Sequence, residues 1–366
     1  MKDIYAITAP SHFSKVLSSL HLKNVLLVTG KKSFENSGAE KFISQSTKGI
    51  RTTRYFDFSI NPNQEDLNIA VQKLSINHFD AILSVGGGSV IDMGKLIKYS
   101  VSKSIPLIAV PTTAGTGSEA TSFAVLYVNK KKTSVEDKEM LPQIIIHNKT
   151  LLESASPYLI AHAALDALSQ AIESYWSIHS TEESLAYAKE SIRLVWEYLP
   201  KVIQTGDKSL MSYLQQAAFV SGKAINITKT TAAHAVSYFF TSHFTIPHGH
   251  AVALTLPEFL EMNGNIDEEN IADERGVDYV KQRVNEIYGL IGASGSIDAK
   301  QKMIRFIEKA GLNISDMQPL GLTETDIPLI IKNINLERSG NNPCKLSIAD
   351  YTKVLQNVFN RKKRER

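Results

Sequence analysis

Residues 81–95 read AILSVGGGSVIDMGK, and this stretch decides the fold. Its first five residues form an almost continuous apolar run, which is typical of a strand covered on both faces in a parallel sheet. Gly86, Gly87 and Gly88 end the strand, and residues 90–99 have the pattern of a helix. Glycines let the backbone approach a ligand closely, and a helix N-terminus carries partial positive charge. The stretch therefore predicts a strand–turn–helix unit that either binds a phosphate or is simply a tight turn.

Similar units lie on both sides of this stretch. Short apolar runs at residues 25–29, 107–110 and 144–146 each end in turn residues. Between such runs, residues 64–76 have the pattern of an amphipathic helix. This rhythm predicts a doubly wound α/β sheet of the Rossmann-like kind. No Gly-Lys-Ser/Thr ends the glycine segment, so it is not a Walker P-loop, and the full dinucleotide glycine fingerprint is also missing.

The pattern becomes helical from Pro157 onward, with loops expected at residues 263–265 and 292–295. We therefore expect an α/β domain over residues 1–153 and an all-α domain over residues 154–366. The predicted helices of the second domain cover residues 159–175, 183–198, 210–225, 279–291 and 300–310.

Composition excludes several classes of protein. The 366 residues are 43% hydrophobic and carry a formal net charge of +3, which gives no nucleic-acid signal. No apolar run approaches the ~20 residues of a membrane span, and the first residues do not resemble a signal peptide. The single cysteine, Cys344, excludes an intramolecular disulfide and a multi-cysteine zinc site. We expect a cytoplasmic protein whose basic tail, residues 361–366, is a solvated chain end, and any metal must have histidine and carboxylate ligands.

Three further segments carry residues suited to chemistry, and each allows a structural reading by itself. Residues 111–119, PTTAGTGSE, follow a predicted strand and either contact a nucleotide or form a plain loop. His234, His248 and His250 belong to a histidine-rich stretch that is either metal-binding or surface and core. Asp166 and Glu173 lie seven residues apart on one face of a predicted helix, and by themselves they could simply be capping and packing groups.

Taken together and in this order, the motifs resemble those of the iron-containing (group III) alcohol dehydrogenase family over nearly the whole chain. The carriers are residues 86–95, the segment 111–119, Asp166-Ala167-Leu168, His234 with Pro247-His248-Gly249 fourteen residues later, and the late segment 335–343. The resemblance implies a Rossmann-like domain, a helical domain and an active site in the cleft between them.

The resemblance also implies site residues. A divalent metal, Fe²⁺ or Zn²⁺, would be bound by Asp166, His234 and His248. A dinucleotide, NADP or NAD, would be held by Gly86, Gly87, Gly88, Ser89, Asp92, Thr112, Thr113, Thr116, Ser118 and Lys132. Two positions depart from the family: Gln170 stands where a histidine ligand is usual, and Tyr238 stands where another active-site histidine is common. Gln170 is therefore a doubtful fourth ligand, while His250 and Tyr238 are candidates for the proton relay.

The expected function is that of an NAD(P)-linked alcohol dehydrogenase, or aldehyde reductase, acting on a small alcohol/aldehyde pair. Arg338 and Lys132 favour an anionic substrate such as phosphonoacetaldehyde, and the alternative is that these side chains are solvated or bind the cofactor. The turn at Gly30, Lys31, Lys32 and Ser33 favours NADP(H), because its basic residues suit a 2′-phosphate, and the alternative is a solvated turn that does not discriminate between NAD and NADP. The alternatives are a lyase like dehydroquinate synthase and a nucleotide-binding relative without catalysis. By family resemblance we expect a homodimer, with no nucleic-acid or membrane partner.

Overall fold

The structure is a computed structural model that describes residues 3–74, 78–129 and 131–361. The chain forms two compact units. The first comprises Met1–Ser156 together with Lys208–Gln215, and the second comprises Pro157–Asp207 together with Gln216–Arg366.

The first unit contains a six-stranded sheet in the order β1-β8-β5-β4-β2-β3. Every neighbouring pair is parallel, as the continuous apolar runs predict. The parallel Rossmann-like sheet is therefore confirmed. Its strands are β1 Asp3–Ala6, β2 Asn24–Thr29, β3 Arg51–Tyr55, β4 Ala81–Gly86, β5 Leu107–Pro111 and β8 Ile144–His147.

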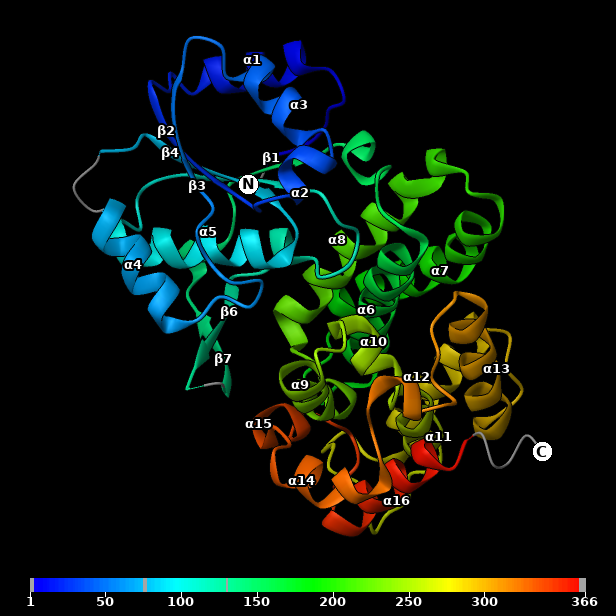
Figure 1. The fold of residues 1–366 in the computed structure, drawn as a ribbon. Helices are drawn as coiled ribbons and strands as arrows, with labels where there is room; N and C mark the ends of the chain where they lie inside the picture. The colour runs from blue at the N-terminus through cyan, green and yellow to red at the C-terminus, as the bar shows by residue number, and fades with distance from the viewer. Residues whose placement is uncertain (1–2, 75–77, 130, 362–366) are drawn as a thin grey trace. The chain divides into compact units, whose positions relative to one another are not determined.

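Helices cover both faces of this sheet (Figure 1). Successive residues of a strand point to opposite faces, so Val25 and Leu27 of β2 pack with α1 to α3 while Leu26 and Val28 pack with α4 and α5. Each face thus has its own apolar core. The covering helices are α1 Pro10–Ser19, α2 Ser33–Asn36, α3 Ala39–Ser46, α4 Gln64–Leu74 and α5 Gly88–Val101.

An antiparallel hairpin, which the sequence did not predict, follows the segment 111–119. It pairs β6 (Phe123–Val128) with β7 (Lys131–Glu136), and Tyr127 lies opposite Lys132. The hairpin packs Ala124 and Leu126 onto the core of α4 and α5.

The second unit is helical throughout its described elements, which confirms the helical character expected beyond Pro157. The predicted loop at residues 263–265 is wrong in part, because α11 continues to Gly264. A Cβ atom on Gly264 would lie 1.8 Å from the Tyr288 hydroxyl, so this glycine serves close packing rather than a turn. The helices are α6 Pro157–Trp176, α7 Glu182–Thr205, α8 Met211–Thr228, α9 Ala232–Phe244, α10 His248–Ala253, α11 Leu256–Gly264, α12 Val277–Leu290, α13 Ser296–Lys309, α14 Ile327–Lys332, α15 Leu336–Ser339 and α16 Ile348–Phe359. The start of α8, up to Gln215, belongs to the first unit.

Helix α6 lies in the centre of the second unit's core. From Ile160 to Trp176 every residue except His162 is buried. A buried polar group is costly unless it has a hydrogen-bond, ionic or metal partner. The polar side chains of α6 therefore mark positions where the core contains such partners. Those side chains include Asp166, Gln170 and Glu173.

The end of the described chain corrects one expectation. Arg361 is not a solvated residue: it is buried, and its guanidinium donates to the carbonyls of Ile314 and Leu254 and to the Glu258 carboxylate at 2.8–2.9 Å. The rest of the basic tail, residues 362–366, lies outside the described residues.

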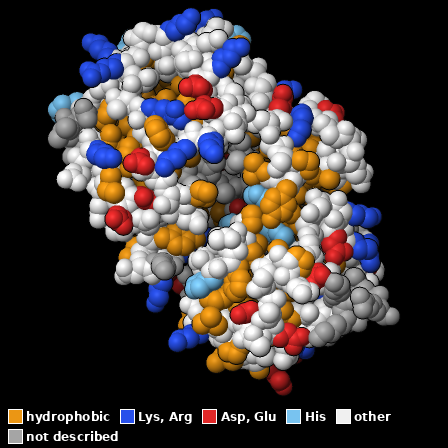
Figure 2. Space-filling view, viewed as in Figure 1, with side chains coloured by type: hydrophobic (Ala, Val, Ile, Leu, Met, Phe, Trp, Pro, Cys, Tyr) orange, Lys and Arg blue, Asp and Glu red, His pale blue; other side chains and the backbone are white. Residues whose placement is uncertain are grey.

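The surface and the helix lengths bear on partners. On the face drawn in Figure 2, Lys and Arg side chains are dispersed among acidic and uncharged ones. Among the described residues, no helix combines the length and the apolar character needed to cross a membrane.

Candidate metal centre and nucleotide-binding loops

Three metal-ligand side chains converge inside the second unit. Asp166 comes from α6, His234 from the first turn of α9, and His248 is the first residue of α10. One ligand atom from each lies within 4.8 Å of the others. His234 Nε2 is 3.4 Å and His248 Nε2 is 3.9 Å from Asp166 Oδ1.

A glycine makes this convergence possible. Gly249 follows His248 directly, and a Cβ atom there would lie 1.8 Å from the His162 carbonyl oxygen of α6. Only glycine lets the start of α10 approach α6 so closely. The Pro247-His248-Gly249 motif therefore has a steric reason: it brings His248 to Asp166.

The three side chains fit a divalent cation. Two ligands bound to one such ion at about 2.1 Å lie roughly 3–4 Å apart, and both histidine nitrogens lie at such a distance from Asp166 Oδ1. Within the described residues, His234 Nε2 is buried and makes no hydrogen bond, as expected of an atom that ligates an ion. Two imidazoles and one carboxylate suit iron or zinc and leave coordination positions open.

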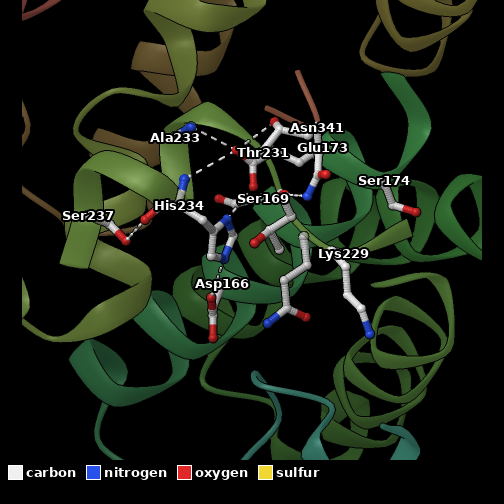
Figure 3. Close-up of polar contacts among 12 residues, drawn as sticks. Asp166, Ser169, Glu173, Ser174, Lys229, Thr231, Ala233, His234, Ser237 and Asn341 are labelled. Carbon is white, nitrogen blue, oxygen red and sulfur yellow. Dashed lines mark hydrogen bonds and ion pairs between the residues drawn. The ribbon is translucent and has the colours of Figure 1, made fainter. Parts of the chain in front are cut away.

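Carboxylates on two sides of His234 set its electrostatics. Burial lowers the pKa of His234, but the Glu173 and Asp166 carboxylates outweigh burial and raise it above the ordinary value. Glu173 Oε2 is hydrogen-bonded to His234 Nδ1, and His234 Nε2 points toward Asp166 (Figure 3). The side chain is thus held between a supporting carboxylate and a ligand carboxylate.

Gln170 lies on α6 one turn beyond Asp166 and is buried. Its amide oxygen accepts a hydrogen bond of 3.0 Å from Ser221 Oγ. Its part as a weak fourth ligand stays a prediction.

The two proton-relay candidates have different surroundings. The Tyr238 ring lies 6.0 Å from the His248 ring, and burial raises the pKa of Tyr238. His250 makes hydrogen bonds with both ring nitrogens, to the Tyr158 hydroxyl at 3.1 Å and to the Asn313 carbonyl at 2.7 Å, and burial lowers its pKa. Tyr238 is therefore the candidate placed beside a metal ligand, whereas His250 is engaged elsewhere in the unit.

The first unit brings the two predicted nucleotide segments together. Gly86 at the end of β4 pairs with Pro111 at the end of β5, so both loops leave the same edge of the sheet. A Cβ atom on Gly88 would lie 2.7 Å from Thr116 Oγ1, and one on Gly87 would lie 3.1 Å from Thr113 Oγ1. Because these glycines have no side chains, residues 111–119, here called the threonine loop, can pack directly on residues 86–88.

The N-terminus of α5 lies at this junction. No side chain caps α5, because its N-cap residue is Gly87. The first backbone N–H groups of this long helix have no intrahelical acceptor, and they suit a phosphate. Ser89 and Thr112 belong to the same junction, where Thr112 N donates to the Gly86 carbonyl at 3.0 Å.

A buried lysine, which the sequence did not single out, ties the threonine loop to α5. Lys95 is fully buried and its ammonium donates to Ser118 Oγ at 3.2 Å and to Thr121 Oγ1 at 2.8 Å. Ser118 in turn donates to Asp92, whose other oxygen accepts from Val125 N. Burial raises the pKa of Asp92, and the charges of Lys95 and Lys132 oppose that shift. Asp92 and Ser118 thus hold the loop, and their direct contact with a nucleotide stays a prediction.

Arg54 is the second residue that the sequence did not single out. Its guanidinium donates to Thr29 Oγ1 at 2.9 Å and to the carbonyls of Gly30 and Lys31 at 3.1 and 3.2 Å. It also lies 4.6 Å from the ring centres of both Phe34 and Phe56. The Arg54 guanidinium therefore anchors the turn that begins at Gly30 and is expected to favour NADP(H). A single arginine in a strand gives no indication of such a contact in the sequence.

Comparisons with known proteins agree with this arrangement. The family model for iron-containing alcohol dehydrogenase matches residues 4–149, and the model for the C-terminal region of Fe-containing alcohol dehydrogenases matches residues 160–359. A phosphonoacetaldehyde reductase of Streptomyces viridochromogenes is 30% identical over 75% of each chain. The NAD-dependent methanol dehydrogenase of Bacillus methanolicus is 26% identical over 94% of each.

A solved structure is similar over almost the whole length. It is the sulfoacetaldehyde reductase from Bifidobacterium kashiwanohense in complex with NAD⁺, with 26% identity and a TM-score of 0.84. The match covers 98% of this chain and 97% of that one.

Proposed function

The chain belongs to the iron-containing alcohol dehydrogenase family, and from that premise we propose that it interconverts a small alcohol and its aldehyde with NAD(P) and a divalent metal. The observation that carries the proposal is the convergence of Asp166, His234 and His248. In this group the buried His234 Nε2 lies 3.4 Å from Asp166 Oδ1 and makes no hydrogen bond among the described residues.

The two parts of the chain have separate tasks in this proposal. Residues 1–153 bind the dinucleotide, with Gly86, Gly87, Gly88 and Ser89 at the pyrophosphate and Thr112, Thr113 and Thr116 beside it. Residues 154–366 bind the metal through Asp166, His234 and His248, and the substrate. The bound ion would supply Lewis-acid polarisation of the substrate oxygen, and the nicotinamide would supply the hydride chemistry.

We assign substrate choice to Arg338. Its side chain is 7% exposed and donates a hydrogen bond to the Tyr238 hydroxyl, and the Tyr238 ring lies 6.0 Å from His248. A guanidinium close to the metal ligands suits an anionic group on the substrate. Two relatives act on aldehydes of this kind according to their names, phosphonoacetaldehyde and sulfoacetaldehyde. The proposed substrate is a short aldehyde bearing a phosphonate, a sulfonate or a carboxylate.

An aldehyde panel tests the function. Phosphonoacetaldehyde, sulfoacetaldehyde and neutral propanal are each assayed with NADH and with NADPH, after metal removal and after addition of Fe²⁺, Zn²⁺ or Mn²⁺. The expected result is metal-dependent reduction with higher kcat/KM for the anionic aldehydes. Equal kcat/KM values for propanal and for the two anionic aldehydes would contradict the proposed preference for an anionic substrate. Tight NAD that is never released, with no net oxidation or reduction, would point to the lyase instead.

Two further properties belong to the proposal. A homodimer follows from the family resemblance, and light scattering checks it: a monomeric mass at micromolar concentration would contradict it. A cytoplasmic location is supported by the single cysteine of the chain, since a secreted protein more often uses disulfides.

A further inference from the structure

Glu173 is a buried carboxylate that the proposed chemistry leaves without a task. It lies on α6 seven residues after Asp166 and is fully buried. Its Oε1 accepts three hydrogen bonds, from Thr231 Oγ1 at 2.9 Å, Ala233 N at 2.8 Å and His234 N at 3.2 Å (Figure 3). One carboxylate oxygen on α6 therefore satisfies two backbone N–H groups in the first turn of α9.

Glu173 replaces the ordinary cap of α9. Thr231 is the N-cap residue, but its side chain makes no capping bond, because its hydroxyl donates to Glu173 and accepts from Trp176 Nε1 at 3.0 Å. The N-terminus of a helix carries unpaired N–H groups and partial positive charge, both of which favour a carboxylate there. The backbone of His234, in this first turn, is thereby fixed to α6.

The second oxygen of the same carboxylate fixes the imidazole. Glu173 Oε2 is hydrogen-bonded to His234 Nδ1. An ionised carboxylate only accepts hydrogen bonds, so Nδ1 must carry the hydrogen. In the neutral ring the free lone pair is then on Nε2, the atom 3.4 Å from Asp166 Oδ1.

We propose that Glu173 is a positioning residue that clamps His234 at its backbone and its ring, and so presents His234 Nε2 to the metal ion. The inference rests on the proposed metal centre. A carboxylate behind a ligating histidine orients the ring, fixes its tautomer and makes it a better donor. Here the same group also docks the helix that carries the ligand.

The variant Glu173→Gln tests the clamp with little change in shape. The amide oxygen can still accept from Thr231, Ala233 and His234, but the amide NH₂ then faces His234 Nδ1. That nitrogen would have to accept, which moves the ring hydrogen to Nε2 and blocks the lone pair. We expect the Kd for Zn²⁺ and for Co²⁺ to rise about 10- to 100-fold, measured by competition with a chromophoric chelator on full-length, metal-stripped protein.

Matched variants separate the clamp from a general effect of losing a buried acid. Glu258→Gln makes the same change at a buried carboxylate that is paired with Lys300 and Arg361, and it should leave the Kd unchanged. Glu173→Asp keeps an acceptor-only group and should recover part of the affinity lost in Glu173→Gln. Equal weakening in Glu258→Gln, or wild-type affinity in Glu173→Gln, overturns the inference.

The wild-type protein supplies an independent readout should Glu173→Gln fail to fold. In the zinc-loaded form, ¹⁵N NMR should show His234 with hydrogen on Nδ1 and metal on Nε2, and metal on Nδ1 would overturn the clamp. Wild-type protein that binds neither Zn²⁺ nor Co²⁺ would instead refute the proposed metal centre itself, so the two failures are distinguishable.

Discussion

At the scale of single residues, the proposed metal ligands Asp166, His234 and His248 come from three different helices. Residue type alone left each of them open, and only the resemblance to the family named them together. Asp166 stands out as an acid in an apolar helix, and His248 stands out between a proline and a glycine. The partners of Glu173 were not predictable, because its bonds to Thr231, Ala233 and His234 join segments about sixty positions apart. Sequence spacing left Glu173 open as a capping or packing group, and the structure makes it a cap for another helix.

Substitution of Gln170 tests how many strong ligands the centre has. An amide oxygen is a weak ligand for a transition metal, whereas imidazole is a strong one. Gln170→His should therefore tighten metal retention, seen as slower loss of metal to a chelator during dialysis. Ser221→Ala is the control: it removes the hydroxyl that bonds the Gln170 amide oxygen and the Ala218 carbonyl, and it leaves the side chain at position 170 unchanged. Unchanged or faster metal loss in Gln170→His would show that position 170 does not face the ion.

Arg338 should discriminate between substrates by charge. In Arg338→Met, kcat/KM for phosphonoacetaldehyde should fall at least tenfold, while the value for propanal should change little. The reason is that truncation removes a charge-assisted contact, commonly worth about 1.5–3 kcal/mol. Parallel losses for both aldehydes would mean that Arg338 supports Tyr238 and the fold rather than the substrate.

The turn after β2 should bear on the choice of cofactor. Lys31 and Lys32 are predicted to favour the 2′-phosphate of NADPH, although Lys31 already lies 3.5 Å from the Asp57 carboxylate. Replacing both lysines with alanine should weaken NADPH binding several-fold and leave NADH binding unchanged, by fluorescence titration. Lys41→Ala, at an exposed position of α3, controls for the loss of a surface charge. Tighter NADH than NADPH binding in the wild type would reverse the preference.

At the scale of elements, the strongly patterned segments were predicted and the weakly patterned ones were not. Strand β4 is buried at every position and gives a continuous apolar run, so its sequence is unambiguous. Strand β7 reads KKTSVE and has no buried residue, so neither apolar continuity nor apolar alternation marks it. Short helices such as α10 depend on tertiary contacts with α6, which a local pattern does not contain.

Gly249 gives a prediction at this scale. Gly249→Ala would place a methyl group where 1.8 Å separates the Cβ position from the His162 carbonyl oxygen, so α10 must move away from α6. Overpacking of this kind costs typically 1–3 kcal/mol of stability, and here it should also withdraw His248 from the ion. We expect a lower melting temperature together with weaker Zn²⁺ binding.

Gly289 is the matched control for that substitution, because a Cβ atom there meets nothing within 4 Å. Gly289→Ala should therefore retain wild-type metal affinity. Full Zn²⁺ affinity in Gly249→Ala would show that the close approach of α10 to α6 does not set the position of His248.

At the scale of the whole molecule, the order of strands and helices along the sequence was enough to predict the fold class. Alternating strands and helices predicted the parallel sheet of the first unit, and the continuous helical pattern predicted the second. The segment Lys208–Gln215 packs with the first unit although it follows α7 in the chain, which no local feature of its sequence indicates.

The central claim is that the ion held by Asp166, His234 and His248 is required for turnover, and metal removal tests it most directly. Stripping the full-length protein with a chelator should abolish aldehyde reduction, and one equivalent of Fe²⁺ or Zn²⁺ should restore it. His234→Ala should bind no ion and show no turnover under the same additions, because it removes a strong ligand. Wild-type turnover in protein shown by elemental analysis to be metal-free would contradict the account and leave the three side chains as polar contacts to the substrate.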